Sequence, residues 1–467
     1  MKRFYFISLF FLHFCSGWSQ TIDSTELITI NKIKIEGNRK TKSQIITREL
    51  SLEEGKQYQR FELDSIFIWD RNRIYRSNLF NEVTFSIEPI SSGQADIKLT
   101  VQERWYIYPI PIFKLIDRNF NDWWTNRNRD LSRVNYGMRL SHFNFRGRSE
   151  LLRLTAQFGF TSRLSVLYRI PYIEKTQKHG LSFSFAFQEA KNLAVVTSDN
   201  VRRFLQGEDL LRTVYRSRVT HSYRNSFYSF HFLNLGHTSA TITDTVAVLN
   251  PNYFGDGTTK QSYFRAGYSY AWDKRDNRNY PLDGEWYTAA ITKFGLGLSN
   301  DNVDFWTLNF SAARFREIGN EFYHASNLIG VISLPRDRSY FNYFSIGFLK
   351  NSLRGYELNV VEGSTYLIQK NDIKKKIFSR KKDISRFMPV RQFQTFPIAL
   401  YGKVFFDQGY AQGYPNYGGS DKLDDQYLYA FGVGLDLVVI HDSVFRFELS
   451  QNKQGQTNFF INFLSAF

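Results

Sequence analysis

The sequence predicts a mainly β protein, in which a transmembrane antiparallel β-barrel of about 16 strands follows one small α+β domain. Three observations predict this fold. Phe, Trp and Tyr make up 17% of the 467 residues. Most of the chain falls into short segments in which apolar and polar residues alternate. Beyond the N-terminal segment, no stretch approaches the ~18 consecutive apolar residues that a membrane helix needs. Alternation with abundant aromatic residues is typical of membrane barrels, whose strands face lipid on one side and water on the other.

Residues 1–20 have the layout of a secretory signal peptide. Lys2 and Arg3 supply a positive start, residues 4–14 form a largely apolar run, and small and polar residues follow. We therefore expect export and cleavage near the end of this segment. Cys15 is the only cysteine, so the mature chain is expected to contain neither disulfides nor thiolate chemistry.

The net charge of +16 leaves two interpretations open. Basic residues in solvated turns and loops can contact an anionic membrane surface. Alternatively, an electropositive lumen can attract an anionic client. The export signal argues against a nucleic-acid partner.

Residues 27–104 predict the small domain, with the element order β-α-α-β-β. Residues 32–36 alternate polar and apolar, which predicts a half-buried strand, and the Gly-Asn pair at 37–38 predicts a turn. Thr41 and Gln44 have the spacing of a capping box, which would open a short helix.

A longer helix is predicted after Gly55, over residues 61–77, because its apolar residues share one face. Residues 83–87 and 97–101 alternate in the period of strands. Pro89 is expected to end the first of these two strands.

The same domain resembles a polypeptide-transport-associated (POTRA) domain. The resemblance rests on Ile-Glu-Gly-Asn at 35–38, Gly55, Leu-Phe-Asn-Glu-Val at 79–83 and Val-Gln-Glu at 101–103. It implies β-augmentation, in which an extended client strand pairs with an open edge of the sheet. Which strand forms that edge stays open at this point.

Residues 105–467 predict the barrel. Residues 429–439, 445–449 and 264–272 each place apolar side chains on one parity and small or polar ones on the other. Apolar residues that face lipid and polar residues that face a wet lumen explain all three. A soluble sandwich is the alternative, but so many strands would lack a second apolar layer to pack against.

The end of the chain resembles the C-terminal signal by which outer-membrane barrels are recognised for assembly. Phe459, Ile461 and Phe463 alternate toward the terminal Phe467, with Ser465 as a departure. A hydrophobic last strand without a recognition role would look nearly the same.

Three further motifs resemble the BamA/TamA superfamily of outer-membrane assembly and translocation proteins (bacterial surface antigen type). They are Trp-Asp-Lys-Arg-Asp-Asn at 272–277 with Tyr-Pro-Leu-Asp-Gly at 280–284, Leu-Arg-Gly-Tyr-Glu at 353–357, and Phe-Phe-Asp-Gln-Gly at 405–409. The residues of interest are Asp273, Arg275 and Asp276 at a strand end, Arg354, Gly355 and Tyr356 on a loop, and Asp407 and Gly409 on a strand. The resemblance implies that the long extracellular loop folds back into the lumen.

Parity places Asp407 on the lumen side of its strand, because Val404 and Phe406 occupy the parity that suits lipid. If the loop folds inward, the Arg354 guanidinium and the Asp407 carboxylate can form a charge-assisted, bidentate pair. Gly355 would permit the close backbone approach. Two unrelated surface charges are the alternative.

Two features depart from the family or stand outside its motifs. The chain has room for a single POTRA domain, which argues against the housekeeping insertase with its several such domains. A basic run, within residues 370–382, is expected in a long periplasmic turn, either solvated or docking an acidic periplasmic accessory protein.

No catalytic, metal or cofactor motif stands out. There is no Gly-x-Ser-x-Gly, His-Glu-x-x-His or glycine-rich phosphate loop, and His231 and His237 are poorly spaced for a metal. We therefore expect a protein that is not an enzyme and needs no cofactor.

The resemblance implies an outer-membrane assembly, insertion or polypeptide translocation factor with its POTRA domain in the periplasm of a Gram-negative type envelope. Its partners would be unfolded outer-membrane or exported polypeptides and outer-membrane lipid. The alternatives are a passive porin or ligand-binding barrel and a structural surface barrel.

Overall fold

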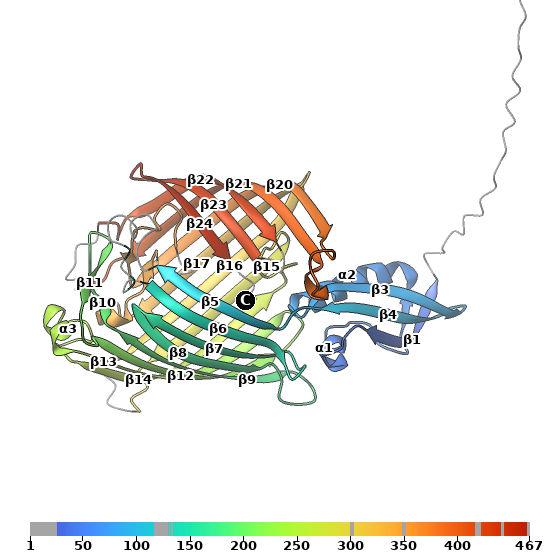
Figure 1. The fold of residues 1–467 in the computed structure, drawn as a ribbon, viewed down its shortest axis with the longest axis horizontal. Coiled ribbons are helices and arrows are strands. Elements are labelled where there is room, and N and C mark those ends of the chain that lie inside the picture. Colours follow the sequence, from blue (N-terminus) through green and yellow to red (C-terminus); the bar gives the residue numbers. More distant parts are fainter. Residues whose placement is uncertain are drawn as a thin grey trace, which may run out of the picture.

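The computed structural model describes residues 26–115, 129, 131, 134–298, 303–347, 352–415, 422–439 and 443–464. The expected signal peptide and Phe467 lie outside these residues. A small α+β domain precedes a large β-barrel and lies at one end of it (Figure 1). The predicted fold class is therefore confirmed.

The small domain contains a four-stranded sheet with two helices. Its elements are β1 Leu27–Glu36, α1 Ser43–Thr47, β2 Gln57–Gln59, α2 Arg60–Arg76, β3 Phe80–Ser91 and β4 Gln94–Glu103. The sheet order is β2-β1-β4-β3, so the long strand β3 is an edge. Under the helices, Ile74 of α2 packs in one core cluster with Leu99, and Leu63 packs in a second with Ile97. The sequence missed β2, since three residues are too few to show a period.

Two local predictions in this domain were wrong. Thr41 does not cap α1, which begins after Lys42 without a side-chain cap. The Thr41 hydroxyl instead lies 2.9 Å from the Tyr106 hydroxyl and accepts a hydrogen bond from Asn144 at 2.8 Å. Pro89 does not end β3, which continues to Ser91. An edge strand tolerates proline because its outer N–H groups have no ladder partner to lose.

The barrel is one sheet of sixteen strands, the number that the sequence predicts. The strands are β5 Ile107–Leu115, β6 Val134–Phe145, β7 Glu150–Gly159, β8 Thr161–Ile170, β9 His179–Ala190, β12 Arg212–Arg224, β13 Ser229–Ile242, β14 Lys260–Asp273, β15 Gly284–Phe294, β16 Phe305–Gly319, β17 Phe322–Leu334, β20 Thr365–Asp383, β21 Thr395–Gln412, β22 Tyr427–Val439, β23 Ser443–Asn452 and β24 Thr457–Leu464. All neighbours pair antiparallel, in chain order from β5 to β24. Among the described residues, no pairing joins the end strands β5 and β24.

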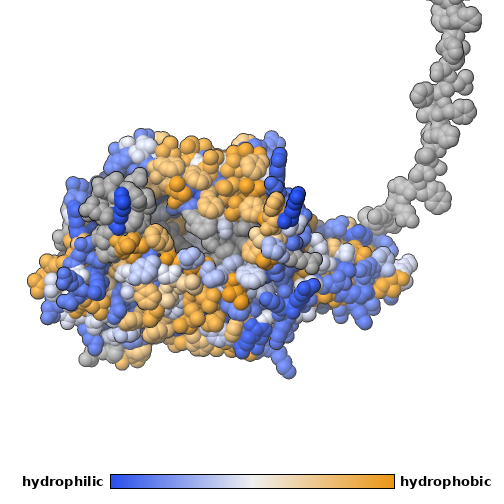
Figure 2. All heavy atoms as spheres, in the orientation of Figure 1, coloured by the Kyte–Doolittle hydropathy of each residue, from blue (hydrophilic) through white to orange (hydrophobic). Residues whose placement is uncertain are grey.

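The strands alternate as the sequence predicts. On β21, Val404 and Phe406 are exposed, whereas Lys403, Phe405 and Asp407 are buried on the opposite parity. Figure 2 shows the result as a hydrophobic belt over the barrel, with hydrophilic residues toward both ends. The outer face therefore suits lipid.

No helix in the described part of the chain is both long and apolar enough to cross a membrane.

The barrel end away from the small domain carries the larger connections. They include the hairpin β10 Asn192–Ser198 and β11 Val201–Gln206, the helix α3 Asp244–Leu249, and a segment between β17 and β20 that contains η3 Tyr340–Asn342, β18 Ser345–Ile346 and β19 Val361–Glu362. At the opposite end, η5 Arg391–Phe393 follows β20 and meets the small domain, because Asn81 donates to the Gln392 carbonyl at 2.8 Å.

The basic run is not a turn, which corrects the sequence prediction. It lies within β20, a strand of 19 residues that pairs with β21 along its length. Ile373 and Ile377 keep an exposed apolar parity through the run, and Lys374 on the other parity is only 4% exposed. The lysines therefore divide between the lumen and the strand end near η5.

Gly37 and Gly55 provide a test of the small domain. Both have positive φ, at +92° and +82°, but a Cβ on Gly37 would lie 1.9 Å from the Val101 carbonyl oxygen, whereas nothing lies within 4 Å at Gly55. Alanine at either site adds the ~1–2 kcal/mol cost of the left-handed conformation. Only Gly37→Ala also forces β1 and β4 apart. Limited proteolysis of the full chain should cut the small domain much faster in Gly37→Ala than in Gly55→Ala. Equal cleavage would contradict this account.

Candidate functional site in the barrel lumen and at the domain joint

The segment that follows β18 lies against the inner wall of the barrel. Leu353 and Tyr356 are completely buried there, and the Tyr356 hydroxyl donates to the Tyr429 carbonyl at 3.3 Å. Gly355 has φ +83°, and a Cβ on it would lie 2.7 Å from the Ala430 Cβ. Its carbonyl accepts a hydrogen bond from Asn452 at 2.9 Å. A residue larger than glycine would therefore push the segment off the wall.

Arg354 is the centre of this contact. Its Nε donates to Oδ2 of Asp407 at 2.7 Å, and its Nη2 donates to the other oxygen of the same carboxylate, so the pair is bidentate. Nη1 donates to Asp372 at 2.6 Å and to Glu448 at 3.3 Å. The guanidinium also stacks over the Phe405 ring at 3.9 Å. One loop arginine thus joins three strands, β20, β21 and β23.

The charged cluster extends below Arg354. Lys403 Nζ lies 2.7 Å from Asp436 and 2.8 Å from Glu448, and both Lys403 and Asp436 are buried. The Tyr280 hydroxyl donates to Asp436 at 3.0 Å. Tyr280 belongs to the sequence motif at 280–284, Arg354 to the motif at 353–357 and Asp407 to the motif at 405–409, so all three barrel motifs meet in one cluster.

The sequence missed Asp372, Glu448 and Lys403 as members of this cluster. Strand parity could have indicated that all three face the lumen, because each of them is next to an apolar, lipid-facing residue on its strand. Parity does not say which lumen charges meet, since the members lie on strands that are not all neighbours. Gly409 is nearby without a polar role: a Cβ on it would lie 3.5 Å from Leu353.

The energetics of the cluster favour a single loop position. Desolvating several charges costs about as much as their attraction returns, so the cluster adds little net stability. Removing one member is expensive, because its partners are left charged and buried. The loop is therefore held in one arrangement, because any other arrangement would leave buried charges without their partners.

The strand-end motif forms a second site, at the barrel end that carries the small domain. The Asp273 carboxylate accepts two hydrogen bonds from Arg275, at 2.9 and 3.0 Å. Asp276 accepts the N–H groups of Asn277 at 2.8 Å and Leu282 at 3.1 Å, which closes the turn. Burial raises the pKa of the Asp276 carboxyl above its usual range, although these N–H groups oppose the shift.

This turn also holds the small domain. Arg76, the last residue of α2, donates to the Asp273 carbonyl and lies 3.6 Å from its carboxylate. Arg73 stacks over the Phe227 ring at 3.7 Å. Glu49 accepts two hydrogen bonds from Arg224, at 2.6 and 2.7 Å. The helical side of the domain is therefore fixed to the turns that follow β12 and β14.

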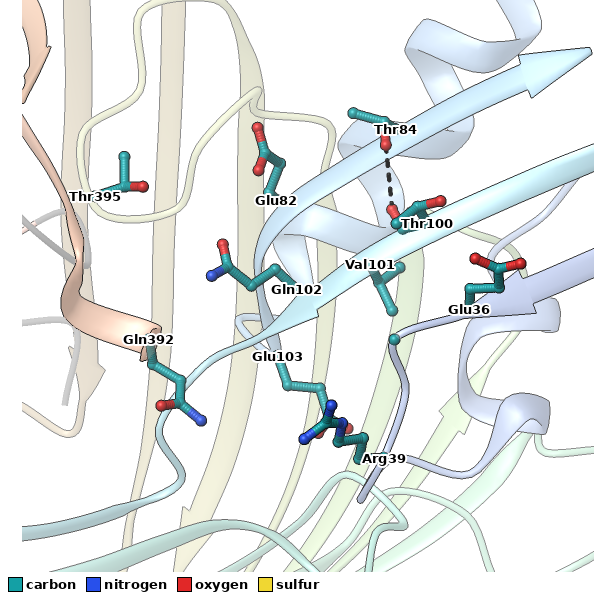
Figure 3. Close-up of a pocket in the computed structure, with 11 residues that line it drawn as sticks. Glu36, Arg39, Glu82, Thr84, Thr100, Val101, Gln102, Glu103, Gln392 and Thr395 are labelled. Carbon is teal, nitrogen blue, oxygen red and sulfur yellow. Dashed lines mark hydrogen bonds between the residues drawn. The ribbon is translucent and has the colours of Figure 1, made fainter. Parts of the chain in front are cut away.

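The other side of the domain borders an open cleft of about 490 Å³. Its walls are the face of the β1-β4-β3 sheet away from the helices and the chain around η5, as Figure 3 shows. Glu36, Glu82 and Glu103 make it predominantly acidic, with Arg39 as the one cation among its lining residues. The exposed edge strand β3 contributes Glu82 and Thr84 to the cleft.

Two family models match the chain. The model described as "Surface antigen variable number repeat", the POTRA model, matches residues 28–104. The model described as "Omp85 superfamily domain" matches residues 144–451, which is most of the barrel. The chain belongs to the Omp85 superfamily. The small domain is accordingly called the POTRA domain below.

Solved Omp85-type structures share the fold at low sequence identity. BamA from Haemophilus ducreyi lacking POTRA domains 1–3 aligns with 14% identity and a TM-score of 0.51, over 94% of this chain and 85% of that one. CdiB from Escherichia coli aligns with 12% identity and a TM-score of 0.55, over 94% and 76%. CdiB from Acinetobacter baumannii gives 13% and 0.52, over 94% and 73%. No curated protein matches the chain.

Metal binding finds no support in the described residues, where no group of three or more His, Cys, Asp or Glu could hold an ion. His231 and His237 instead contact Tyr268 at 2.7 Å and Ser262 at 3.0 Å. Phe463 lies on β24, the last strand.

The Arg354 contact predicts a strongly non-additive mutant cycle. Arg354→Ala should destabilise the barrel by roughly 3–5 kcal/mol, because it leaves the buried Asp407 and the partly buried Asp372 without their cation. Adding Asp407→Ala should cost little more, or relieve part of the loss, since it removes one stranded charge. The folded fraction during heating, read from gel mobility without boiling, measures both effects.

Arg386→Ala serves as the control, because Arg386 is exposed near the end of β20. It should melt like the wild type. If the Arg354→Ala and Asp407→Ala defects simply add, the two residues do not act as a pair.

The Glu49–Arg224 pair predicts pH-dependent docking of the POTRA domain. Burial would raise the pKa of Glu49, but the hydrogen bonds and charge of Arg224 hold it below its ordinary value. The pair therefore stabilises docking fully above the ordinary pKa of about 4.5 and loses that contribution as pH falls further. Spin labels on Gln57→Cys and Lys175→Cys should report a distance distribution that broadens as the pH is lowered well below 4.5.

Glu49→Gln should show the broad distribution already at pH 7 and change less on acidification. A variant with the same sharp distribution as the wild type at pH 7 would show that the pair does not hold the joint.

Proposed function

We propose that this protein inserts or translocates polypeptides at an outer membrane, with its POTRA domain in the periplasm as the receiver of unfolded clients. The observation that carries the proposal is an open edge strand on a POTRA domain fixed to an Omp85 barrel. The superfamily comprises transport and assembly proteins rather than enzymes, and no step here requires covalent chemistry or a cofactor.

The client would be received on β3. This strand has 12 residues and pairs with β4 on one side only, whereas the other edge strand, β2, has three residues. An extended client segment can satisfy its backbone groups by adding to such an edge. The acidic cleft beside η5 would give the segment a path from β3 toward the barrel (Figure 3).

The barrel would then handle the client at its seam or through its lumen. The end strands β5 and β24 are the candidates for the seam, and both lie on the near side of the barrel in Figure 1. A nascent strand in lipid cannot leave its backbone groups unpaired, so transient pairing with a seam strand lowers the barrier to insertion. The segment around Arg354 would keep the far end of the lumen occupied while this happens.

The barrel's surroundings follow from the same proposal. Its apolar belt would sit in outer-membrane lipid, and periplasmic accessory proteins would have the exposed lysines at the end of β20 as a contact surface.

Reconstitution tests the proposal. Liposomes that contain the full-length protein should accelerate the folding of a urea-denatured barrel client several-fold over empty liposomes, measured by gel mobility without boiling. Steady ion conductance without acceleration of any client would instead support a passive porin and overturn the proposal.

Crosslinking in the same liposomes identifies the receiving edge. A photoreactive residue at Thr84 on β3 should capture the unfolded client. The same residue at Gln57 on β2 is the matched control, since that position is also exposed, and it should capture little. Preferential capture at Gln57 would rule out β3 as the receiver.

A further inference from the structure

One half of the inner barrel wall carries arginines without acidic partners. The residues are Arg153 on β7, Arg163 and Arg169 on β8, Arg216 and Arg218 on β12, and Arg265 on β14. We call this set the arginine wall. Within the part of the chain that the structure describes, none of the six forms an ion pair.

Strand parity shows that these side chains face the lumen. Leu164 and Val166 on β8 are exposed on the opposite, lipid-facing parity, as is Val219 on β12. Arg216 lies 5.8 Å from the ring of Phe341, which belongs to η3 in the long connection after β17. Arg163, for its part, is an exposed residue despite facing inward. Water therefore reaches this wall.

The arginines repel one another. Arg218 and Arg265 both pair in register with Gly236, so they flank it on adjacent strands. The missing side chain at Gly236 leaves room for Arg265, whose Nε would lie 2.9 Å from a Cβ there. Arg163 is close enough to Arg216 for repulsion, and Arg153 to Arg169.

The facing wall is different, because its cations Arg354 and Lys403 are matched by carboxylates. Clustered like charges destabilise a sheet. Where a fold keeps such a cost, the position is expected to serve function.

We propose that the arginine wall binds acidic stretches of an extended client polypeptide. Arg216 and Arg218 are two apart on β12 and so are separated by ~6.8 Å, which is also the spacing of alternate side chains in an extended peptide. A segment with alternating carboxylates can therefore match these two arginines, and the other four offer further cations on the neighbouring wall. The six arginines spread over four strands rather than converging on one point, which suits a chain of carboxylates better than a single phosphate. The inference rests on the proposed function and names the chemistry of the client.

Peptide binding to the full-length protein in detergent tests the inference. The probe is a fluorescent peptide that alternates Glu and Ser, followed by anisotropy, and its counterpart alternates Lys and Ser. The variant carries Arg163→Gln, Arg169→Gln and Arg218→Gln. We expect this variant to bind the acidic peptide at least about tenfold more weakly than the wild type does. The wild type should not bind the basic peptide.

Two variants make the result specific. Arg71→Gln, Lys175→Gln and Arg386→Gln remove the same charge from exposed positions outside the lumen and should leave binding unchanged. Arg163→Lys, Arg169→Lys and Arg218→Lys keep the lumen charge and should retain binding within about threefold, which also tests the wall if the Gln variant fails to fold.

Equal binding by the wild type and the Gln variant would overturn the inference. The inference would also be overturned if the Gln variant lost binding to a purified bisphosphorylated outer-membrane lipid but still bound the acidic peptide. The wall would then bind lipid rather than polypeptide. If the peptide-binding test failed but the protein still accelerated the folding of clients in liposomes, the arginine wall would be ruled out as the binding surface and the proposed function would be unaffected.

Discussion

The placement of the barrel's inward segment depends on the buried guanidinium of Arg354. A single side chain from a loop meets carboxylates from β20, β21 and β23, three strands that a simple turn cannot join. Arg354, Asp407 and Glu448 are buried and Asp372 is partly so, and their charges therefore depend on one another to be tolerated. Moving the segment away from the wall would leave several buried charges without partners. This cost explains how a long connection stays inside a barrel that water can enter.

The charge distribution divides the lumen into two halves. Beside Arg354 the charges cancel, and the wall is packed and nearly dry. Across from it the arginine wall is hydrated and uncompensated. A polypeptide inside the barrel would therefore meet one surface that is already occupied and one that is free and cationic. The net charge of +16 thus comes in part from the lumen and not only from turns and loops.

Sequence reasoning reached the fold and the parity of each strand, because both follow from period-two alternation. It also placed Asp407 on the lumen side and proposed Arg354 as its partner. It could not find Asp372 or Glu448, since contact across a lumen depends on strand register and loop path. It failed at Thr41 because a hydroxyl that can cap a helix can equally bind a neighbouring element, here Tyr106 and Asn144.

The turn after β14 has a mechanical consequence. Asp273, at its start, is bound by Arg76 of the POTRA domain, and Tyr280, seven residues later, is bound to Asp436 of the lumen cluster. A tilt of the POTRA domain would pull on this short turn at Asp273, and the turn would pass the displacement to Asp436 in the lumen. The contact that holds the POTRA domain and the contact that reaches the lumen cluster are thus joined by the short segment 273–280.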